Sequence, residues 1–241
     1  MLGLPAQITV ALFDLDGVLT TTATVHSEAW RRAFDAFLVA RAADGGAPGE
    51  DLRPFADRDY LDHVDGRPRL DGVRGFLASR SIVVDDAAVE AIAEAKNTEF
   101  LATLARDGVT AYPGSVRYLN AAREAGLRIA VVTSSKNGAA VLEAAGLTSF
   151  VEHRVDGNTI VDEQLRGKPA PDSYLRGAEL MGVAPTEAAV FEDAISGVQA
   201  GAAGHFGYVV GIDRVGGPQA ENMATAGADV VVTDLDALLS H

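Results

Sequence analysis

Short apolar runs alternate with helical patterns along most of this 241-residue chain, and the alternation limits the possible folds more than any other feature. Buried parallel strands have nearly continuous apolar sequences, and a strand–helix–strand order is typical of α/β proteins with right-handed crossovers. The sequence therefore predicts an α/β fold with a doubly wound parallel-sheet core. The expected strands are Ile8–Phe13, Leu127–Thr133, Ala188–Phe191, Tyr208–Ile212 and Val230–Thr233, and the expected helices around the later strands are Ser115–Ala125, Gly138–Ala145, Pro171–Met181 and Pro218–Ala226.

The interval 22–110 departs from this alternation because it contains only helical patterns. A helical block inserted directly after the first strand predicts a small all-helical cap domain over residues 22–110, and residues 1–21 and 111–241 form the predicted catalytic core. Short segments near 20–22 and 111–113 are the expected hinges. The expected cap helices are Val25–Val39, Phe55–Val64, Gly72–Ser79 and Asp86–Ala105.

Composition excludes several classes of function. A net charge of −14 disfavours nucleic acid and anionic membranes as partners, although a few local cations can still bind a small phosphorylated ligand. The chain has no cysteine, so disulfides and thiolate metal sites are impossible.

No apolar run approaches the roughly 20 residues of a membrane-spanning helix. With no basic residue before the first apolar run, we expect no signal peptide and a cytoplasmic protein. A monomer is the default expectation.

Asp14-Leu15-Asp16-Gly17 directly follows the first predicted strand. Ligands of open α/β sheets bind beyond the carboxyl ends of the strands, and residues two apart in extended chain point the same way. Two such carboxylates can hold Mg²⁺ beside a phosphate, with one attacking phosphorus and the other moving a proton. Taken alone, the pattern also fits an ordinary acidic turn.

Three further polar groups follow predicted strands or open helices. Thr133-Ser134-Ser135 supplies hydroxyls that can bind phosphate oxygens or cap a helix. Lys168 precedes a helix opened by Pro171 and can neutralise charge on a phosphoryl group, although a lone lysine is usually just solvated. Glu192-Asp193 is a second acid pair with the oxygen ligands that magnesium prefers. Together these groups predict a phosphoryl-transfer site.

The ordered set of Asp14-x-Asp16-Gly-Val-Leu-Thr, Thr133 with Ser135, Lys168 and Glu192-Asp193 resembles the motifs of the haloacid dehalogenase superfamily over essentially the whole chain. The inserted helical block is similar to that superfamily's small cap. Closer agreement with the β-phosphoglucomutase family is carried by the segments Thr22-Ala23-x-x-His26, Ser135-Lys136-Asn137-Gly138 and Lys168-Pro169-Ala170-Pro171-Asp172. The resemblance implies a Rossmann-like core that catalyses phosphoryl transfer with Mg²⁺.

The same resemblance implies a role for each core residue. Asp14 becomes an aspartyl phosphate, and Asp16 is the general acid and base on the sugar hydroxyl. Thr133 and Lys168 hold the transferring phosphoryl group. The metal ligands would be Asp14, the Asp16 carbonyl, Glu192 and Asp193.

For substrate binding, the resemblance points to the cap and to the loop after the second strand. Arg69 is expected to bind the phosphate that is not transferred, and Asp65, just before Gly66, departs from the family by replacing a basic residue. Ordinary surface or helix-face roles remain open for the cap residues. The full predicted substrate-binding set is Thr22, His26, Gly66, Arg67, Arg69, Lys96, Ser134, Ser135, Lys136 and Asn137.

The resemblance implies an isomerase that interconverts β-D-glucose 1-phosphate and glucose 6-phosphate through a glucose 1,6-bisphosphate intermediate. A magnesium-dependent phosphatase of a small sugar phosphate is the alternative, because it needs the same Asp14, Asp16, Lys168 and Asp193. A catalytically silent binding module is the third reading, and the presence of both Asp14 and Asp16 counts against it.

Overall fold

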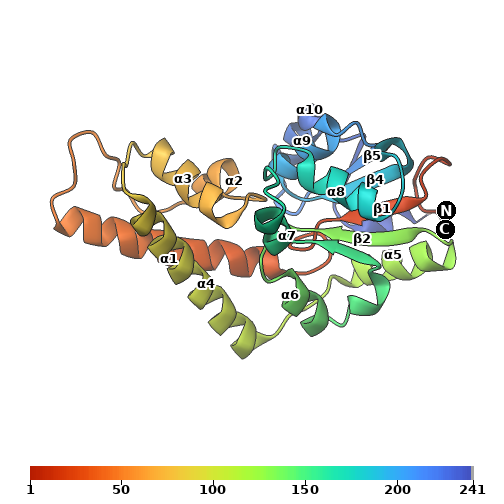
Figure 1. The fold of residues 1–241 in the computed structure, drawn as a ribbon, viewed down its shortest axis with the longest axis horizontal. Coiled ribbons are helices and arrows are strands. Elements are labelled where there is room, and N and C mark those ends of the chain that lie inside the picture. Colours follow the sequence, from red (N-terminus) through yellow and green to blue (C-terminus); the bar gives the residue numbers. More distant parts are fainter. Residues whose placement is uncertain (240–241) are drawn as a thin grey trace. The chain divides into compact units, whose positions relative to one another are not determined.

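The computed structural model describes residues 1–239 and divides the chain into two compact units (Figure 1). The sheet unit contains Met1–Thr21 and the chain from Val109 onward, and the helical unit is Thr22–Gly108. No helix among the described residues is long and apolar enough to cross a membrane.

Six parallel strands form the sheet unit's central layer, in the order β3-β2-β1-β4-β5-β6 (Figure 1). The chain builds outward from β1 through β2 to β3 and then returns to β1's other side with β4, so the switch point lies between β1 and β4. This topology confirms the predicted doubly wound α/β class. The strands are β1 Val10–Phe13, β2 Arg128–Val132, β3 His153–Val155, β4 Ala188–Glu192, β5 Tyr208–Ile212 and β6 Val230–Val232.

Strand register brings the polar segments to one edge of the sheet. Phe13, the last residue of β1, pairs with Val131 on β2 and with Phe191 on β4. The residues that follow these three strands therefore leave the sheet at nearly the same level. The segments beginning at Asp14, Thr133 and Asp193 are neighbours for this reason.

Helices cover both faces of this sheet (Figure 1). Val10 and Leu12 of β1 belong to the apolar core beneath α8 and α9, whereas Phe13 points the other way and packs edge-on against Tyr118 of α5. This alternation is what a strand buried on both faces requires. The helices of the sheet unit are α5 Pro113–Glu124, α6 Gly138–Ala144, α7 Gly157–Asp162, α8 Asp172–Leu180, α9 Ile195–Ala203 and α10 Gln219–Ala226.

The helical unit has a separate core made largely of aromatic rings. Phe34 is fully buried at its centre, with ring centroids 5.1 Å from Trp30, 5.0 Å from Phe55 and 4.2 Å from Phe76. Stacked and tilted ring contacts of this kind add stability beyond the buried area. The helices are α1 Thr22–Ala43, α2 Asp57–His63, α3 Arg69–Ser79 and α4 Asp86–Asp107.

Strand β3 and helices α7 and α9 of the sheet unit were not expected from the sequence. Strand β3 has only three residues at the sheet edge, and its exposed His153 and Arg154 break the apolar pattern. Helix α7 is a six-residue element begun by Asp156, whose side chain accepts from the backbone N–H groups of Asn158 and Thr159. Helix α9 is small-residue-rich, so the sequence lacks a clear amphipathic period there.

The chain leaves and re-enters the sheet unit through paired segments, here called the linker ribbon (19–21 and 110–112). Thr20 forms an antiparallel bridge with Ala111, the Thr21 N–H donates to Thr110 O at 2.9 Å, and Tyr112 N–H donates to Leu19 O at 3.0 Å. These bonds join the two segments of the ribbon to each other, and the first segment continues the loop that follows β1.

Removing the central ring of the aromatic core should destabilise the helical unit. We expect Phe34→Ala to lower the free energy of unfolding by about 3–5 kcal/mol, because it leaves a cavity between three rings. Val39→Ala, on the same helix at an exposed position, is the matched control and should change little. Chemical denaturation monitored by Trp30 fluorescence measures the difference, and equal losses in both variants would contradict this packing.

Candidate active site

Asp14 and Asp16 lie directly beyond β1. The Asp14 N–H donates to Phe191 O at 2.9 Å, which joins the start of this segment to β4. The Asp16 side chain is partly exposed, and it accepts from the Thr133 hydroxyl at 3.3 Å. Gly17 has φ +89°, and a Cβ there would collide with the Asp193 carboxylate. The backbone therefore passes close to Asp193 only because position 17 is glycine.

Lys168 lies between the two acid pairs and is fully buried. Its Nζ donates to Asp14 Oδ1 at 2.7 Å, to Glu192 Oε1 at 2.6 Å and to Val132 O at 3.2 Å. Both partner carboxylates are also buried. The ammonium thus has three acceptors, and it joins the ends of β1, β2 and β4.

Glu192 is the second carboxylate that Lys168 contacts. Its Oε1 also accepts from the Tyr174 hydroxyl at 2.8 Å, and its Oε2 accepts from the Ala194 N–H at 3.2 Å. Gly197 on α9 leaves room for this carboxylate, because a Cβ there would overlap it. Tyr174 was missed by the sequence analysis, and the only signal was its place in the helix after the Lys168 motif.

Burial and neighbouring charges both shift the pKa values of the ionisable groups at this site. Burial raises the pKa of Asp14 well above its usual range, Lys168 counteracts this, and the Glu192 and Asp16 carboxylates raise it further. Burial lowers the pKa of Lys168, but Asp14 and Glu192 raise it by more, so the ammonium stays protonated. Burial also raises the pKa of Tyr174, which keeps its hydroxyl a donor. A cation near Asp14 would favour the ionised form that a nucleophile needs.

The Thr133–Asn137 loop is held in a tight turn after β2. Thr133 Oγ1 accepts from the Ser135 N–H at 3.1 Å, and Ser135 Oγ accepts from the Asn137 N–H at 3.2 Å. Asn158 on α7 donates to Lys136 O at 3.0 Å, so α7 is hydrogen-bonded to this loop. The Lys136 side chain is exposed, and Ser134 and Ser135 are partly buried.

Three carboxylates form a possible metal site. Asp14, Glu192 and Asp193 each offer an oxygen atom within 4.8 Å of the others. All-oxygen sites of this kind suit hard cations such as Mg²⁺ rather than zinc. The donor set therefore fits the predicted magnesium, and Glu192 would bind it while also holding Lys168.

In the helical unit, aromatic rings surround the Lys96 side chain. It is 3% exposed, its Nζ is 2.5 Å from His26 Nδ1, and it lies 5.3 Å from the Trp30 ring centroid and 4.7 Å from that of Phe100. The His26 ring also packs on Phe100. The structure therefore brings together two residues predicted separately, with cation–π contacts around the ammonium.

Arg69 begins α3 and is held by α4. Its Nη2 donates to Asn97 Oδ1 at 2.8 Å, and its Nη1 is 3.9 Å from Glu94 Oε2. Burial lowers the pKa of this guanidinium, and Glu94 counteracts the effect. Gly66 precedes it in a turn with φ +71°, Arg67 is partly buried, and Thr22 is buried at the start of α1.

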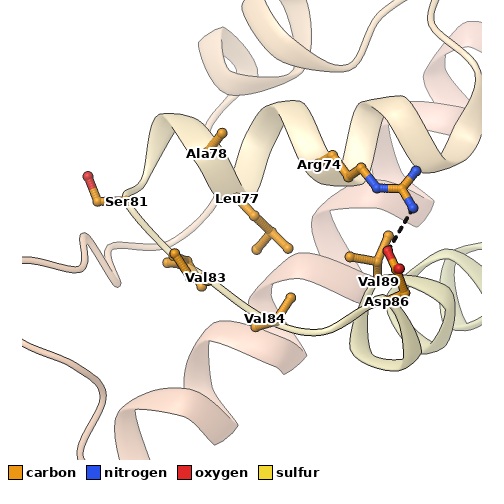
Figure 2. Close-up of a pocket in the computed structure, with 9 residues that line it drawn as sticks. Arg74, Leu77, Ala78, Ser81, Val83, Val84, Asp86 and Val89 are labelled. Atoms are coloured by element: carbon orange, nitrogen blue, oxygen red, sulfur yellow. Dashed lines mark hydrogen bonds and ion pairs between the residues drawn. The ribbon is translucent and has the colours of Figure 1, made fainter.

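A separate cavity of about 320 Å³ lies between the end of α3 and the start of α4 (Figure 2). Leu77, Val84 and Val89 line its apolar part, and an Arg74–Asp86 ion pair of 2.9 Å lies beside it. None of the predicted site residues lines this cavity, so it takes no part in the assignment of the active site.

Comparison with known proteins identifies the family of this chain. Residues 8–205 match the family model for haloacid dehalogenase-like hydrolases. The chain belongs to that family. This confirms the family resemblance inferred from the motifs at Asp14, Thr133, Lys168 and Glu192.

Relatives in the family include both mutases and phosphatases. The chain is 50% identical to a β-phosphoglucomutase of Mycobacterium bovis over 99% of its own length and 94% of the relative's. It is 33% identical to hexitol phosphatase A of Escherichia coli, covering 80% of this chain and 77% of the relative. A crystal structure of β-phosphoglucomutase from Clostridium difficile has a TM-score of 0.76 at 24% identity, over 96% of this chain and 93% of the other.

Lys168→Ala should destabilise the sheet unit in a pH-dependent way. The variant leaves Asp14 and Glu192 buried without their ammonium, and loss of one partner of a buried pair costs about 3–5 kcal/mol. Without Lys168 the pKa of Asp14, which burial already raises, rises further above its unfolded value, so more of the variant's stability is lost as pH increases. Urea unfolding should therefore show a larger deficit at pH 8 than at pH 5. Lys136→Ala is the exposed control, and a pH-independent deficit in Lys168→Ala would contradict the pairing.

Chelation should remove activity reversibly. We expect the carboxylates of Asp14, Glu192 and Asp193 to hold a divalent cation, so exhaustive EDTA treatment should abolish turnover and Mg²⁺ should restore it. Beryllium fluoride with Mg²⁺ should then inhibit by occupying the phosphoryl position at Asp14. Full turnover after chelation would rule out the metal assignment.

Proposed function

We propose that this enzyme catalyses the β-phosphoglucomutase reaction, the interconversion of β-D-glucose 1-phosphate and glucose 6-phosphate with Mg²⁺ as cofactor. The observation that carries the proposal is the 50% identity with the M. bovis enzyme over 99% of this chain. The geometry at Asp14, Asp16 and Lys168 supports phosphoryl transfer as the chemistry.

Asp14 is the nucleophile in the proposed mechanism. One of its oxygens forms a bond to phosphorus as the bond from phosphorus to the departing sugar oxygen breaks, which produces an aspartyl phosphate. Lys168, protonated and 2.7 Å from Asp14 Oδ1, stabilises the negative charge that develops on the phosphoryl oxygens. Mg²⁺ held by Asp14, the Asp16 carbonyl, Glu192 and Asp193 would neutralise further charge on the same group.

Asp16 moves the proton that each half-reaction requires. It takes the proton of the attacking sugar hydroxyl when the phosphoryl group leaves Asp14, and it returns a proton to the departing sugar oxygen in the opposite step. The Thr133 hydroxyl, 3.3 Å from Asp16 Oδ2, orients this carboxyl. The Ser134 and Ser135 hydroxyls are proposed donors to the phosphate itself, and the Thr133 hydroxyl joins them when it turns away from Asp16.

Residues 22–110 act as the cap in this proposal, and residues 1–21 and 111–241 act as the catalytic core. The cap excludes water, because hydrolysis of the aspartyl phosphate would end the mutase cycle. We propose that Arg69 binds the phosphate that is not being transferred, because its planar guanidinium can donate two parallel hydrogen bonds to one phosphate. Gly66, Arg67, Lys96, His26, Thr22, Lys136 and Asn137 complete the proposed substrate-binding set.

Hydrolysis of a small sugar phosphate is the second candidate function. It is favoured by the 33% identity with hexitol phosphatase A and by Asp65, the acid that stands just before Gly66. The higher identity with the mutase places it second. In either case we propose a monomeric, cytoplasmic enzyme that acts on a small phosphorylated sugar.

The reaction product distinguishes the two functions. Incubation with β-glucose 1-phosphate, Mg²⁺ and a trace of glucose 1,6-bisphosphate should yield glucose 6-phosphate, because the second sugar hydroxyl, and not water, accepts the phosphoryl group. A coupled dehydrogenase assay measures this product, and a molybdate assay measures free phosphate in the same sample. Stoichiometric free phosphate in place of glucose 6-phosphate would establish the phosphatase.

Arg69→Ala should separate the mutase reaction from simple hydrolysis. Losing charge-assisted hydrogen bonds to a remote phosphate should lower mutase kcat/KM by roughly 10- to 100-fold. Hydrolysis of acetyl phosphate, which has no second phosphate, should hardly change. Arg74→Ala on the same helix is the matched control. A parallel loss of both activities would make Arg69 structural, and no loss in either would favour the phosphatase.

A further inference from the structure

Arg214 follows β5 and donates hydrogen bonds to two distant segments of the sheet unit. Its Nε donates to Gly17 O at 2.9 Å, and its Nη2 makes a longer bond of 3.5 Å to Val18 O. Its Nη1 donates to Thr233 O at 2.9 Å and to Asp234 Oδ2 at 3.0 Å. The guanidinium therefore bridges the loop after β1 and the segment after β6.

The surroundings of Arg214 keep the guanidinium in this position. It is stacked on Tyr112 of the linker ribbon, with 3.8 Å from Cζ to the ring centroid, and its side chain is 16% exposed. Asp213 accepts from the Val215 and Gly216 N–H groups, which forms the turn that carries Arg214. The planar guanidinium of arginine can donate hydrogen bonds in several directions while it stacks on an aromatic ring. The ammonium of lysine cannot do both.

The loop that Arg214 holds is the one that carries the proposed metal site. Gly17 N–H donates to Thr20 O at 2.7 Å, and the N–H groups of Leu19 and Thr20 both donate to Leu15 O at 3.0 Å. These bonds close residues 15–20 into one turn. The Gly17 carbonyl is one peptide beyond the Asp16 carbonyl, and Gly17 itself lies against the Asp193 carboxylate.

We propose that Arg214 is a positioning residue that fixes the Gly17–Val18 backbone, and through it sets the Asp16 carbonyl and the Asp193 carboxylate for Mg²⁺. The inference rests on the proposed function for the identity of the metal. Arg214 touches neither substrate nor metal in this account. Its role is to anchor the metal loop to β5, the C-terminal segment and the linker ribbon at one point.

Electrostatics and positioning predict opposite results when Arg214 is neutralised. Arg214→Gln removes a positive charge near an acidic site, so a purely electrostatic role predicts tighter Mg²⁺ binding. Loss of positioning predicts weaker binding, by on the order of 10–100-fold, as is typical when a partner of a metal ligand is removed. The sign of the change in Mg²⁺ affinity therefore decides between the two roles.

Isothermal calorimetry of Mg²⁺ binding to the intact chain, without substrate, is the test. Arg117→Gln is the matched control, because Arg117 is paired with Asp236 of the same C-terminal segment but has no hydrogen bond to Gly17 or Val18. Arg214→Lys keeps the positive charge but lacks the planar guanidinium, so it should also bind Mg²⁺ more weakly than the wild type. If Arg214→Gln fails to fold by circular dichroism, Arg214→Lys alone carries the test.

Unchanged or tighter Mg²⁺ binding in folded Arg214→Gln would overturn the inference, and so would wild-type affinity in Arg214→Lys. An equal weakening in Arg117→Gln would overturn it too, because the effect would then come from the C-terminal segment as a whole. The proposed reaction can fail separately. If the wild type binds Mg²⁺ but makes no glucose 6-phosphate, and Arg214→Gln still weakens Mg²⁺ binding, the positioning role stands without the mutase.

Discussion

The rest of the sheet unit depends on one buried ammonium, that of Lys168, between the carboxylates of Asp14 and Glu192. Buried charges are tolerated only when they are paired and hydrogen-bonded, so each of these side chains requires the other two. Lys168 also donates to Val132 O, and Glu192 also accepts from Tyr174. The ends of three strands and the start of α8 are thereby held at one place, which is where we propose that the phosphoryl group meets its nucleophile.

The strand-end residues could be predicted because parallel strands present their carboxyl ends at one edge. Asp14, Thr133 and Glu192 each stand at the end of a recognisable strand, and register then brings them together. Lys168 precedes a recognisable helix start. The three-residue edge strand β3 lacked that signal, since its exposed His153 and Arg154 show no apolar pattern. Local periodicity was therefore enough to predict the fold class, but it was not enough to predict the edge strand β3.

Side chains that act from a distance could not be predicted in this way. Tyr174 reaches Glu192 from 18 residues away, and Arg214 reaches the Gly17 carbonyl from 197 residues away. Neither has a local pattern that distinguishes it from a core tyrosine or a surface arginine. The pairing of His26 with Lys96 across 70 residues is a similar case, because the family resemblance named both residues but only the structure shows their contact.

The central claim is that Asp14 carries the phosphoryl group between the two sugar oxygens. The most direct measurement is peptide mass mapping after rapid acid quench of the enzyme with glucose 1,6-bisphosphate and Mg²⁺. The account predicts one added phosphoryl group on the peptide containing Asp14, with fragmentation placing it on Asp14 and not on Asp16, and no added mass in Asp14→Asn. A phosphoryl group on any other residue, or turnover by Asp14→Asn, would contradict it.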